Sequence, residues 1–149
     1  MKLLIINGPN LNFLGIREPD LYGDESYDTL CKMIKEHAKE KGVEAELFQS
    51  NHEGAIIDKI QEAYLEKMDG IVINPGAYTH YSYAIMDALK SVSMPKIEIH
   101  ITDIESREEF RRISVTSNGC DDLVKGRGLK GYLDAMDMII EKNKPGDHI

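Results

Sequence analysis

The stretch LLIINGPN, residues 3–10, decides the fold of this chain. Its four leading apolar residues do not alternate with polar ones, which predicts a strand covered on both faces, as in a parallel sheet flanked by helices. The polar loop that follows starts at the carboxyl end of this strand. Ligands bind at that edge of open α/β sheets, because backbone groups and helix N-termini converge there around a crevice. Loops also carry polar residues for solubility alone. The first candidate site residues are Asn10, Asn12, Arg17, Glu18 and Tyr22.

The remainder of the chain alternates between helix and strand patterns. Apolar residues recur at three- and four-residue spacing over the predicted helices, which cover 26–41, 55–68, 81–91 and 129–142, with a short acidic helix near 105–112. The predicted strands after the first cover 43–49, 70–73, 96–101 and 123–125. Because such alternation requires a parallel sheet with right-handed crossovers, we expect one flavodoxin-like, doubly wound α/β domain over residues 1–149. Its five-stranded parallel sheet carries helices on both faces, and the alternating strand 43–49 lies nearer the edge.

Composition narrows the class of protein. The 149 residues are 42% hydrophobic, enough for one sizeable core, and 26 acidic residues against 18 basic ones give a net charge of -8. This charge argues against nucleic acid or an acidic membrane surface as a partner, so local positive charge must hold any anionic ligand. The sequence shows no signal-peptide pattern and no apolar run near the ~20 residues of a bilayer span, so we expect a cytoplasmic protein. Cys31 and Cys120 fit neither a disulfide framework nor a metal site.

Glu98 and His100 are two residues apart on the predicted strand 96–101, so both side chains leave the same face. A carboxylate beside a histidine fixes the imidazole tautomer and favours the imidazolium, which prepares a general acid for use near neutral pH. The alternative is a structural ion pair. We favour function, because charged residues on a strand buried on both faces cost free energy unless they are paired or used.

Two further segments place polar residues near the same edge. Residues 74–80 lie between a strand and a helix, where the Asn74 amide and backbone N–H groups are suited to binding hydroxyls or a carboxylate. His80 and Asp87 are ordinary by themselves, since such residues most often cap, pack or face solvent. Arg111 falls near the crevice, where an acidic protein needs cations for an anionic ligand, although arginines on helices commonly face solvent.

The loop after the first strand holds Arg17 and Tyr22 between Gly15 and Gly23, and glycine-bounded loops can close over a ligand as lids. Tyrosine is a poor base at its normal pKa of about 10, and a nearby cation such as Arg17 would favour its phenolate. A surface tyrosine beside an exposed arginine is the alternative that this loop by itself leaves open.

Four separated stretches carry a resemblance to one known family. They are residues 7–23 (NGPNLNFLG, then REPDLYG from 17), 48–54 (FQSNHEG), 74–80 (NPGAYTH) and 98–112 (EIHIT, then REEFRR from 107). In this order, each at the end of a predicted strand, they are far more specific than any single motif. The chain resembles the type II 3-dehydroquinate dehydratases, small flavodoxin-like enzymes of the shikimate pathway, which leads to chorismate and the aromatic amino acids. The likeness spans almost the whole chain.

The resemblance implies a reaction and a role for each matched residue. 3-Dehydroquinate would lose water reversibly by anti elimination through an enolate, giving 3-dehydroshikimate with no metal or organic cofactor. Tyr22 would be the base, Arg17 would lower the pKa of Tyr22 and stabilise the transition state, and His100 would protonate the leaving hydroxyl. Asn10 would hold a water on the enolate oxygen, and Glu98 would orient His100. The residues implied for substrate binding are Asn74, His80, Asp87 and Arg111, with the backbone of Ile101 and Thr102 on the carboxylate.

The resemblance also implies an assembly, since the family is typically a homododecamer. Two departures from the family pattern bear on this expectation and on binding. Asp103 puts a negative charge near an anionic substrate, so we expect modestly weaker binding. The segment 116–122 is more polar and acidic than is usual, in a region that commonly packs between subunits.

Two other interpretations are kept. A flavodoxin-like ligand-binding module, such as a flavin or phosphate carrier, would show a phosphate-binding loop after the first strand. Neither Gly-x-x-x-x-Gly-Lys-Ser/Thr nor Gly-x-Gly-x-x-Gly occurs there. A catalytically silent homologue is disfavoured because Arg17, Tyr22 and His100 are all present.

Overall fold

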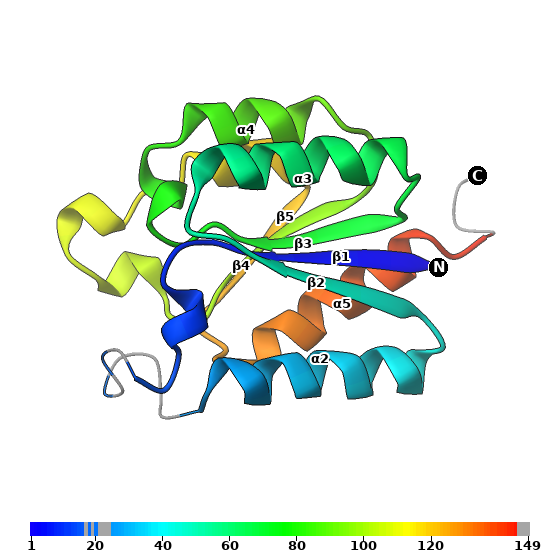
Figure 1. Cartoon of the computed structure of the whole chain (residues 1–149). Coiled ribbons are helices and arrows are strands. Elements are labelled where there is room, and N and C mark those ends of the chain that lie inside the picture. Colours follow the sequence, from blue (N-terminus) through cyan, green and yellow to red (C-terminus); the bar gives the residue numbers. More distant parts are fainter. Residues whose placement is uncertain (17, 19, 21–24, 146–149) are drawn as a thin grey trace.

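The computed structural model describes residues 1–16, 18, 20 and 25–145. Its strands are β1 (Lys2–Asn7), β2 (Glu44–Gln49), β3 (Gly70–Asn74), β4 (Lys96–His100) and β5 (Asp122–Lys125). They form one parallel sheet in the order β2-β1-β3-β4-β5. Helices α2 (Tyr27–Lys41) and α5 (Lys130–Lys142) cover one face, and α3 (Glu53–Leu65) and α4 (Tyr83–Lys90) cover the other (Figure 1). The doubly wound, flavodoxin-like fold predicted from the sequence is confirmed.

β1 is buried on both faces, as its uninterrupted apolar run predicts. Leu3 and Ile5 belong to the core beneath α2 and α5, whereas Leu4 and Ile6 belong to the core beneath α3 and α4. Successive side chains of a strand point to opposite faces, so one short strand joins both cores. Full burial of each such side chain contributes about 1.5–3 kcal/mol, which fixes β1 and the position of the turn that follows it.

Capping residues set where the helices begin and end. Ser26 begins α2 by accepting a hydrogen bond from the Thr29 backbone N–H at 3.1 Å. Gly42 ends α2 in the left-handed conformation, at φ 69°. Ser82 caps α4 by accepting from the Ile85 N–H at 3.0 Å, so this helix begins two residues later than predicted.

The prediction of a helix near 105–112 is wrong. This stretch forms two separate 3-10 turns, η3 (Ile104–Ser106) and η4 (Glu109–Arg111). The backbone at Arg107 is extended, at φ -90° and ψ -175°, which interrupts helical hydrogen bonding between the two turns. Three more 3-10 segments complete the described elements: η1 (Leu11–Phe13), η2 (Gly76–His80) and η5 (Thr116–Gly119).

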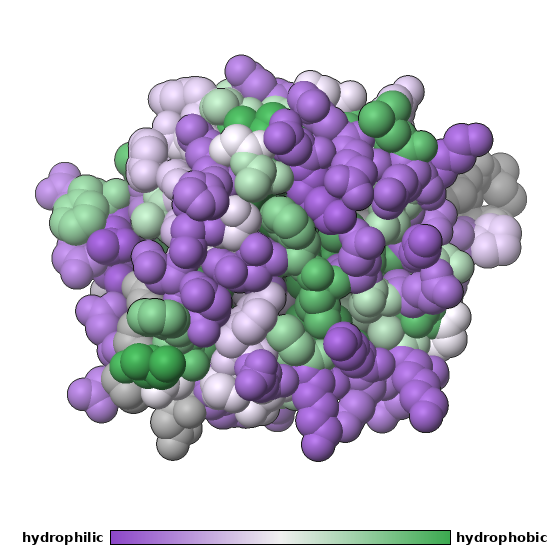
Figure 2. Space-filling model, in the orientation of Figure 1, coloured by the Kyte–Doolittle hydropathy of each residue, from purple (hydrophilic) through white to green (hydrophobic). Residues whose placement is uncertain are grey.

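β2 lies at the edge of the sheet, as its alternating pattern predicts. It pairs with β1, and five of its six residues are half-buried. Figure 2 shows a largely hydrophilic surface on which hydrophobic residues gather in a strip over this edge. The polar turns after β1, β3 and β4 lie at the opposite end of the sheet from the N-terminus (Figure 1).

Candidate active site

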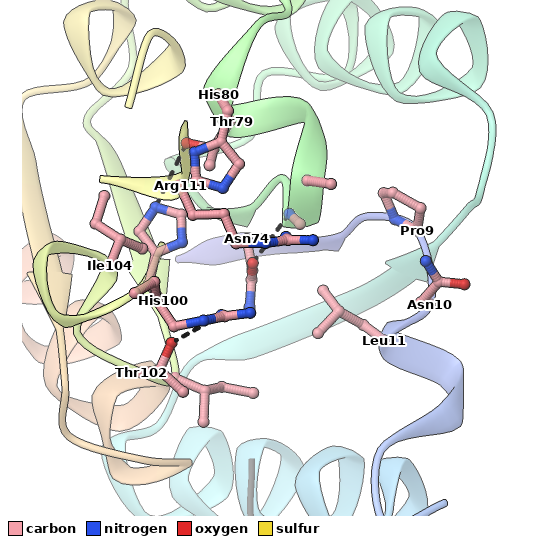
Figure 3. Close-up of a pocket in the computed structure, with 14 residues that line it drawn as sticks. Pro9, Asn10, Leu11, Asn74, Thr79, His80, His100, Thr102, Ile104 and Arg111 are labelled. Carbon is pink, nitrogen blue, oxygen red and sulfur yellow. Dashed lines mark hydrogen bonds between the residues drawn. The ribbon is translucent and has the colours of Figure 1, made fainter. Parts of the chain in front are cut away.

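A pocket opens at the carboxyl ends of β1, β3 and β4, the edge where the sequence predicted a site (Figure 3). It is lined by Pro9, Asn10, Leu11, Asn74, Gly76, Ala77, Thr79, His80, His100, Ile101, Thr102, Ile104, Arg107 and Arg111. Seven of the eleven predicted site residues are among these: Asn10, Asn74, His80, His100, Ile101, Thr102 and Arg111. The fold therefore brings together side chains as distant in the sequence as Asn10 and Arg111.

The other four predicted site residues do not line this pocket. Glu98 is fully buried directly behind His100. Asp87 is exposed on α4 and is not among the lining residues. Arg17 and Tyr22 lie outside the described residues.

Gly8 allows the turns after β1 and β3 to touch. Its N–H donates to the Asn74 carbonyl at 2.8 Å, and a Cβ at this position would lie only 2.4 Å from the Pro75 carbonyl oxygen. A larger residue would push the two turns apart. Asn10 follows in the left-handed conformation, at φ 68°, which asparagine tolerates better than most residues. Its N–H donates to Asn51 Oδ1 at 3.0 Å, so the polar turn after β2 holds the turn after β1.

The Asn74 side chain is oriented by two hydrogen bonds. Its Oδ1 accepts from the Gly76 N–H at 3.1 Å, and its Nδ2 donates to the Tyr132 hydroxyl at 2.9 Å. Tyr132 is fully buried on α5 and donates in turn to Asn7 Oδ1 at 2.6 Å. Burial raises the pKa of Tyr132, so its hydroxyl keeps its proton. The sequence analysis did not identify Tyr132 or Asn7, because no local pattern links α5 to the end of β3.

His100 faces the pocket with Glu98 behind it. The two side chains leave the same face of β4, as predicted, and His100 Nε2 lies 2.7 Å from Glu98 Oε2. Since a carboxylate accepts hydrogen bonds, Nε2 carries a proton in this pair. The ring is thereby held with its other nitrogen, Nδ1, toward the pocket.

Three hydroxyl groups surround the Glu98 carboxylate, and we call Thr79, Ser114 and Thr116 the hydroxyl cage. Ser114 and Thr79 donate to Oε2 at 2.6 and 3.0 Å, and Thr116 donates to Oε1. Burial by itself would raise the pKa of the Glu98 carboxyl. The hydrogen bond and charge of His100, and the hydrogen bonds from Ser114 and Thr116, outweigh burial and lower this pKa. Glu98 is therefore an anion at neutral pH. The cage was not predicted from the sequence, because its hydroxyl residues lie on separate turns and share no regular spacing.

His80 is a second imidazole in the lining, with a different environment. Its Nδ1 donates to the Ile113 carbonyl at 2.8 Å, which leaves Nε2 as an acceptor. Burial lowers the pKa of His80, the Ile113 carbonyl opposes this, and the charge of Arg111 lowers the pKa further. His80 is therefore neutral at neutral pH.

Two guanidinium groups, Arg107 and Arg111, supply positive charge to the pocket. Arg107 Nη1 lies 3.5 Å from Thr102 Oγ1, and Arg111 Nε lies 3.1 Å from Glu108 Oε2. The sequence analysis expected cations at this edge because the protein as a whole is acidic. Arg107 is an additional lining residue beyond those predicted.

Asp103 is balanced by a nearby cation. Its side chain accepts from the Glu105 N–H at 3.0 Å, which caps η3, and Lys125 Nζ lies 3.9 Å from its Oδ1. Lys125 also pairs with Glu105 at 2.8 Å. Asp103 therefore caps η3, and the nearby Lys125 offsets part of the negative charge that was predicted to weaken binding.

The pocket offers imidazole, guanidinium, amide and backbone groups. Among residues 1–16, 18, 20 and 25–145, no group of three or more His, Cys, Asp or Glu side chains is placed to hold a metal ion. No helix in that same part of the chain combines the length and apolarity needed to cross a membrane.

Comparison with known proteins identifies the family of this chain. The sequence model of the family described as dehydroquinase class II matches residues 1–140. The chain is 61% identical over 142 residues to the 3-dehydroquinate dehydratase of Lachnospira eligens, covering 95% of this chain and 97% of that protein. The crystal structure of the type II dehydroquinase from Butyrivibrio crossotus has a TM-score of 0.93 at 64% identity, covering 94% of this chain and 97% of that one. The type II dehydroquinase from Propionibacterium acnes has a TM-score of 0.90 at 40% identity, covering 94% and 96%. The chain therefore belongs to the class II dehydroquinase family.

Proposed function

We propose that this pocket dehydrates 3-dehydroquinate reversibly to 3-dehydroshikimate, by anti elimination through an enolate, as a step of the shikimate pathway. The observation that supports the proposal most strongly is His100, which faces the pocket with the fully buried carboxylate of Glu98 behind it. Glu98 holds Nε2, so Nδ1 is the nitrogen that meets the substrate. In the imidazolium form, His100 donates the Nδ1 proton to the leaving hydroxyl.

Removal of the proton next to the ketone is assigned to Tyr22, with Arg17 favouring its phenolate and stabilising the transition state. Family membership and the intact motif at residues 17–23 support this assignment. Separate residues for accepting and donating protons suit a reaction that removes a weakly acidic proton and protonates a poor leaving group. Asn10, which lines the pocket, is assigned to hold a water on the enolate oxygen.

The remaining lining residues are assigned to substrate binding. Arg111 and Asn74 bind hydroxyl groups, and the Asn74 amide is already oriented for this by Tyr132. His80 is neutral and its Nδ1 proton is engaged by the Ile113 carbonyl, so its Nε2 accepts a hydrogen bond from a substrate hydroxyl. The backbone of Ile101 and Thr102 binds the substrate carboxylate, close to the positive charge of the two arginines.

A homododecamer, located in the cytoplasm, is the assembly we propose for the enzyme. Asp87 supports the association of copies, because it is exposed on α4 and would meet a substrate only in the pocket of a neighbouring copy. Exposed apolar side chains offer surface for such a contact: Tyr81, Tyr83, Phe110 and Ile113. Analytical ultracentrifugation tests the assembly, and a fully active monomer would contradict both the dodecamer and the role of Asp87.

The reaction is tested by the rise in ultraviolet absorbance of the conjugated enone when 3-dehydroquinate is mixed with the purified protein. Tyr22→Phe should lower kcat by about 10²-fold or more, because it removes the base. Tyr64→Phe, at an exposed tyrosine of α3, is the matched control and should keep wild-type activity. If the folded wild type forms no enone, the proposed reaction is wrong. If Tyr22→Phe keeps full activity, the reaction stands and the assignment of the base is wrong.

A further inference from the structure

Thr116 is a fully buried threonine whose hydroxyl contacts the carboxylate of Glu98, although it does not line the pocket. Together with Ser114, Thr79 and His100, it provides four donors to the two oxygens of Glu98. Thr116 begins η5, in the long segment that connects β4 to β5, and this segment returns to pack against β4. A carboxylate offers about four acceptor sites, and a buried one is stable only when donors fill them. Because these donors act on the anion that holds His100, they also bear on how readily His100 releases a proton.

The relevant state is the one that follows proton transfer. When His100 has given its proton to the leaving hydroxyl, the imidazole is neutral and Glu98 is left as a buried anion. If few other groups donated to it, the buried carboxylate would attract the positive charge of the His100 imidazolium strongly and keep it from releasing its proton. Hydroxyl groups that donate to Glu98 stabilise the anion after the transfer, and so they lower the barrier to it.

We propose that Thr116, together with Ser114 and Thr79, acts as a positioning residue that stabilises the Glu98 anion and thereby lets His100 release its proton to the substrate. This inference rests on the assignment of His100 as the general acid. It extends that assignment to a hydroxyl that never touches the substrate and that sits in the segment 116–122, which the sequence analysis associated only with subunit packing.

Among the residues that the structure describes, few other ionisable groups lie close to Glu98. Cys120, after η5, interacts with Glu98, but burial above all raises the pKa of its thiol, which stays protonated across the neutral range. His80 on η2 is the neighbouring imidazole, and it is neutral. The remaining ionisable side chains on the elements packed here have other partners or face solvent: Tyr78 on η2, Tyr83, Asp87 and Lys90 on α4, Lys96 on β4, Asp121 before β5, Asp122 and Lys125 on β5, and Arg107 and Arg111 beside His80.

The test compares Thr116→Val, which replaces the hydroxyl by a methyl at similar volume, with Thr116→Ser, which keeps the donor. In Thr116→Val we expect kcat to fall about threefold to tenfold with KM within about twofold, because the substrate contacts are unchanged. Loss of a donor destabilises the deprotonated pair, so the high-pH limb of the kcat profile should move to higher pH by about one unit. The ¹³C NMR titration of His100 should move in the same direction and needs no substrate. Thr116→Ser should restore all of these values.

A matched control separates this role from a purely structural one. Ser82→Ala removes another buried hydroxyl that donates to a carboxylate, that of Glu53 on α3, and it should lower stability without moving the His100 titration. Ser114→Ala removes a second hydroxyl of the cage and should shift the titration as Thr116→Val does, which keeps the test open if Thr116→Val does not fold.

Two results would overturn the proposal: an unshifted His100 titration in the folded cage variants, or a Thr116→Ser variant that behaves like Thr116→Val. A His100→Gln variant run beside them keeps the two proposals apart. If His100→Gln is inactive while Thr116→Val matches wild type, this inference alone fails. If His100→Gln keeps full activity, the assignment of the acid fails and the inference fails with it.

Discussion

Two histidine–carboxylate pairs in the described part of the chain have the same separation in different surroundings. His100 Nε2 lies 2.7 Å from Glu98 Oε2 at the pocket, and His37 Nε2 lies 2.7 Å from Asp137 Oδ1 where α2 packs beside α5. The Glu98 side chain is 0% exposed and is enclosed by the hydroxyl cage, whereas the Asp137 side chain is 46% exposed, with Lys41 at 4.0 Å. Distance therefore does not separate the pair proposed to act in catalysis from the pair at the surface. Burial, the hydroxyl donors and the adjoining pocket do.

The largest expected difference between the pairs is in catalysis. His100→Asn should lower kcat by about 10²–10⁴-fold, because it removes the proposed proton donor for the leaving hydroxyl. His37→Asn should leave kcat within about twofold, since His37 lies on α2 outside the pocket lining. Enone formation from 3-dehydroquinate at neutral pH measures both. Equal losses in the two variants would show that the pocket histidine has no special role.

The second-largest expected difference between the pairs is in how much each carboxylate contributes to the free energy of unfolding. Glu98→Gln should lower the free energy of unfolding by about 3 kcal/mol, because it breaks a buried ion pair and leaves donors of the cage poorly matched. Asp137→Asn should lower it by less than about 1 kcal/mol, because solvent screens a half-exposed pair. Urea unfolding of both variants and wild type gives these values. If Asp137→Asn were the more destabilising of the two, burial would not be the feature that distinguishes the pairs.

The same Glu98 variant predicts a pH dependence with a definite sign. The pKa of Glu98 is lower in the folded protein than in the unfolded chain, so its ionisation stabilises the fold. That contribution is complete above the unfolded pKa of about 4.3 and is lost as pH falls through the folded pKa. The stability advantage of wild type over Glu98→Gln should therefore be constant well above about pH 4.3 and shrink as the pH falls below that value. Urea unfolding at several pH values measures the difference. A stability advantage that grew on acidification would show that ionised Glu98 does not stabilise the fold.

A smaller effect is expected where a buried hydroxyl supports a neutral side chain. Tyr132→Phe removes the hydroxyl that joins Asn74 to Asn7, so it should lower the free energy of unfolding by about 1–2 kcal/mol. KM should rise about threefold, because the Asn74 amide is then held only by Gly76. Tyr64→Phe is the matched control and should change neither value. A Tyr132→Phe enzyme with unchanged KM would show that β3 alone orients Asn74.

These comparisons also show which parts of the site the sequence could reveal. The run Leu3 to Ile6 predicted a doubly buried strand, because consecutive apolar residues place apolar side chains on both faces of a strand. Glu98 and His100 were predicted as a pair because a strand places alternate residues on one face. The hydroxyl cage and Tyr132 were missed, since hydrogen bonds between side chains on distant turns leave no periodic signal. The stretch after β4 was predicted as one short acidic helix, whereas a side-chain cap at Asp103 and extended backbone at Arg107 divide it into two turns.

The smallest expected effect tests an exposed charge beside the pocket. Lys125 pairs with Glu105 at 2.8 Å and lies 3.9 Å from Asp103, the residue that the sequence analysis expected to repel an anionic substrate. Lys125→Met leaves both carboxylates without this cation, so KM should rise about twofold at low salt and return to the wild-type value at high salt, because solvent and ions screen such charges. Lys35→Met, which removes an exposed lysine of α2, controls for the change in net charge. An unchanged KM at low salt would mean that the charge of Asp103 does not reach the substrate, in contrast to the buried charge of Glu98, whose influence on His100 should persist at any salt concentration.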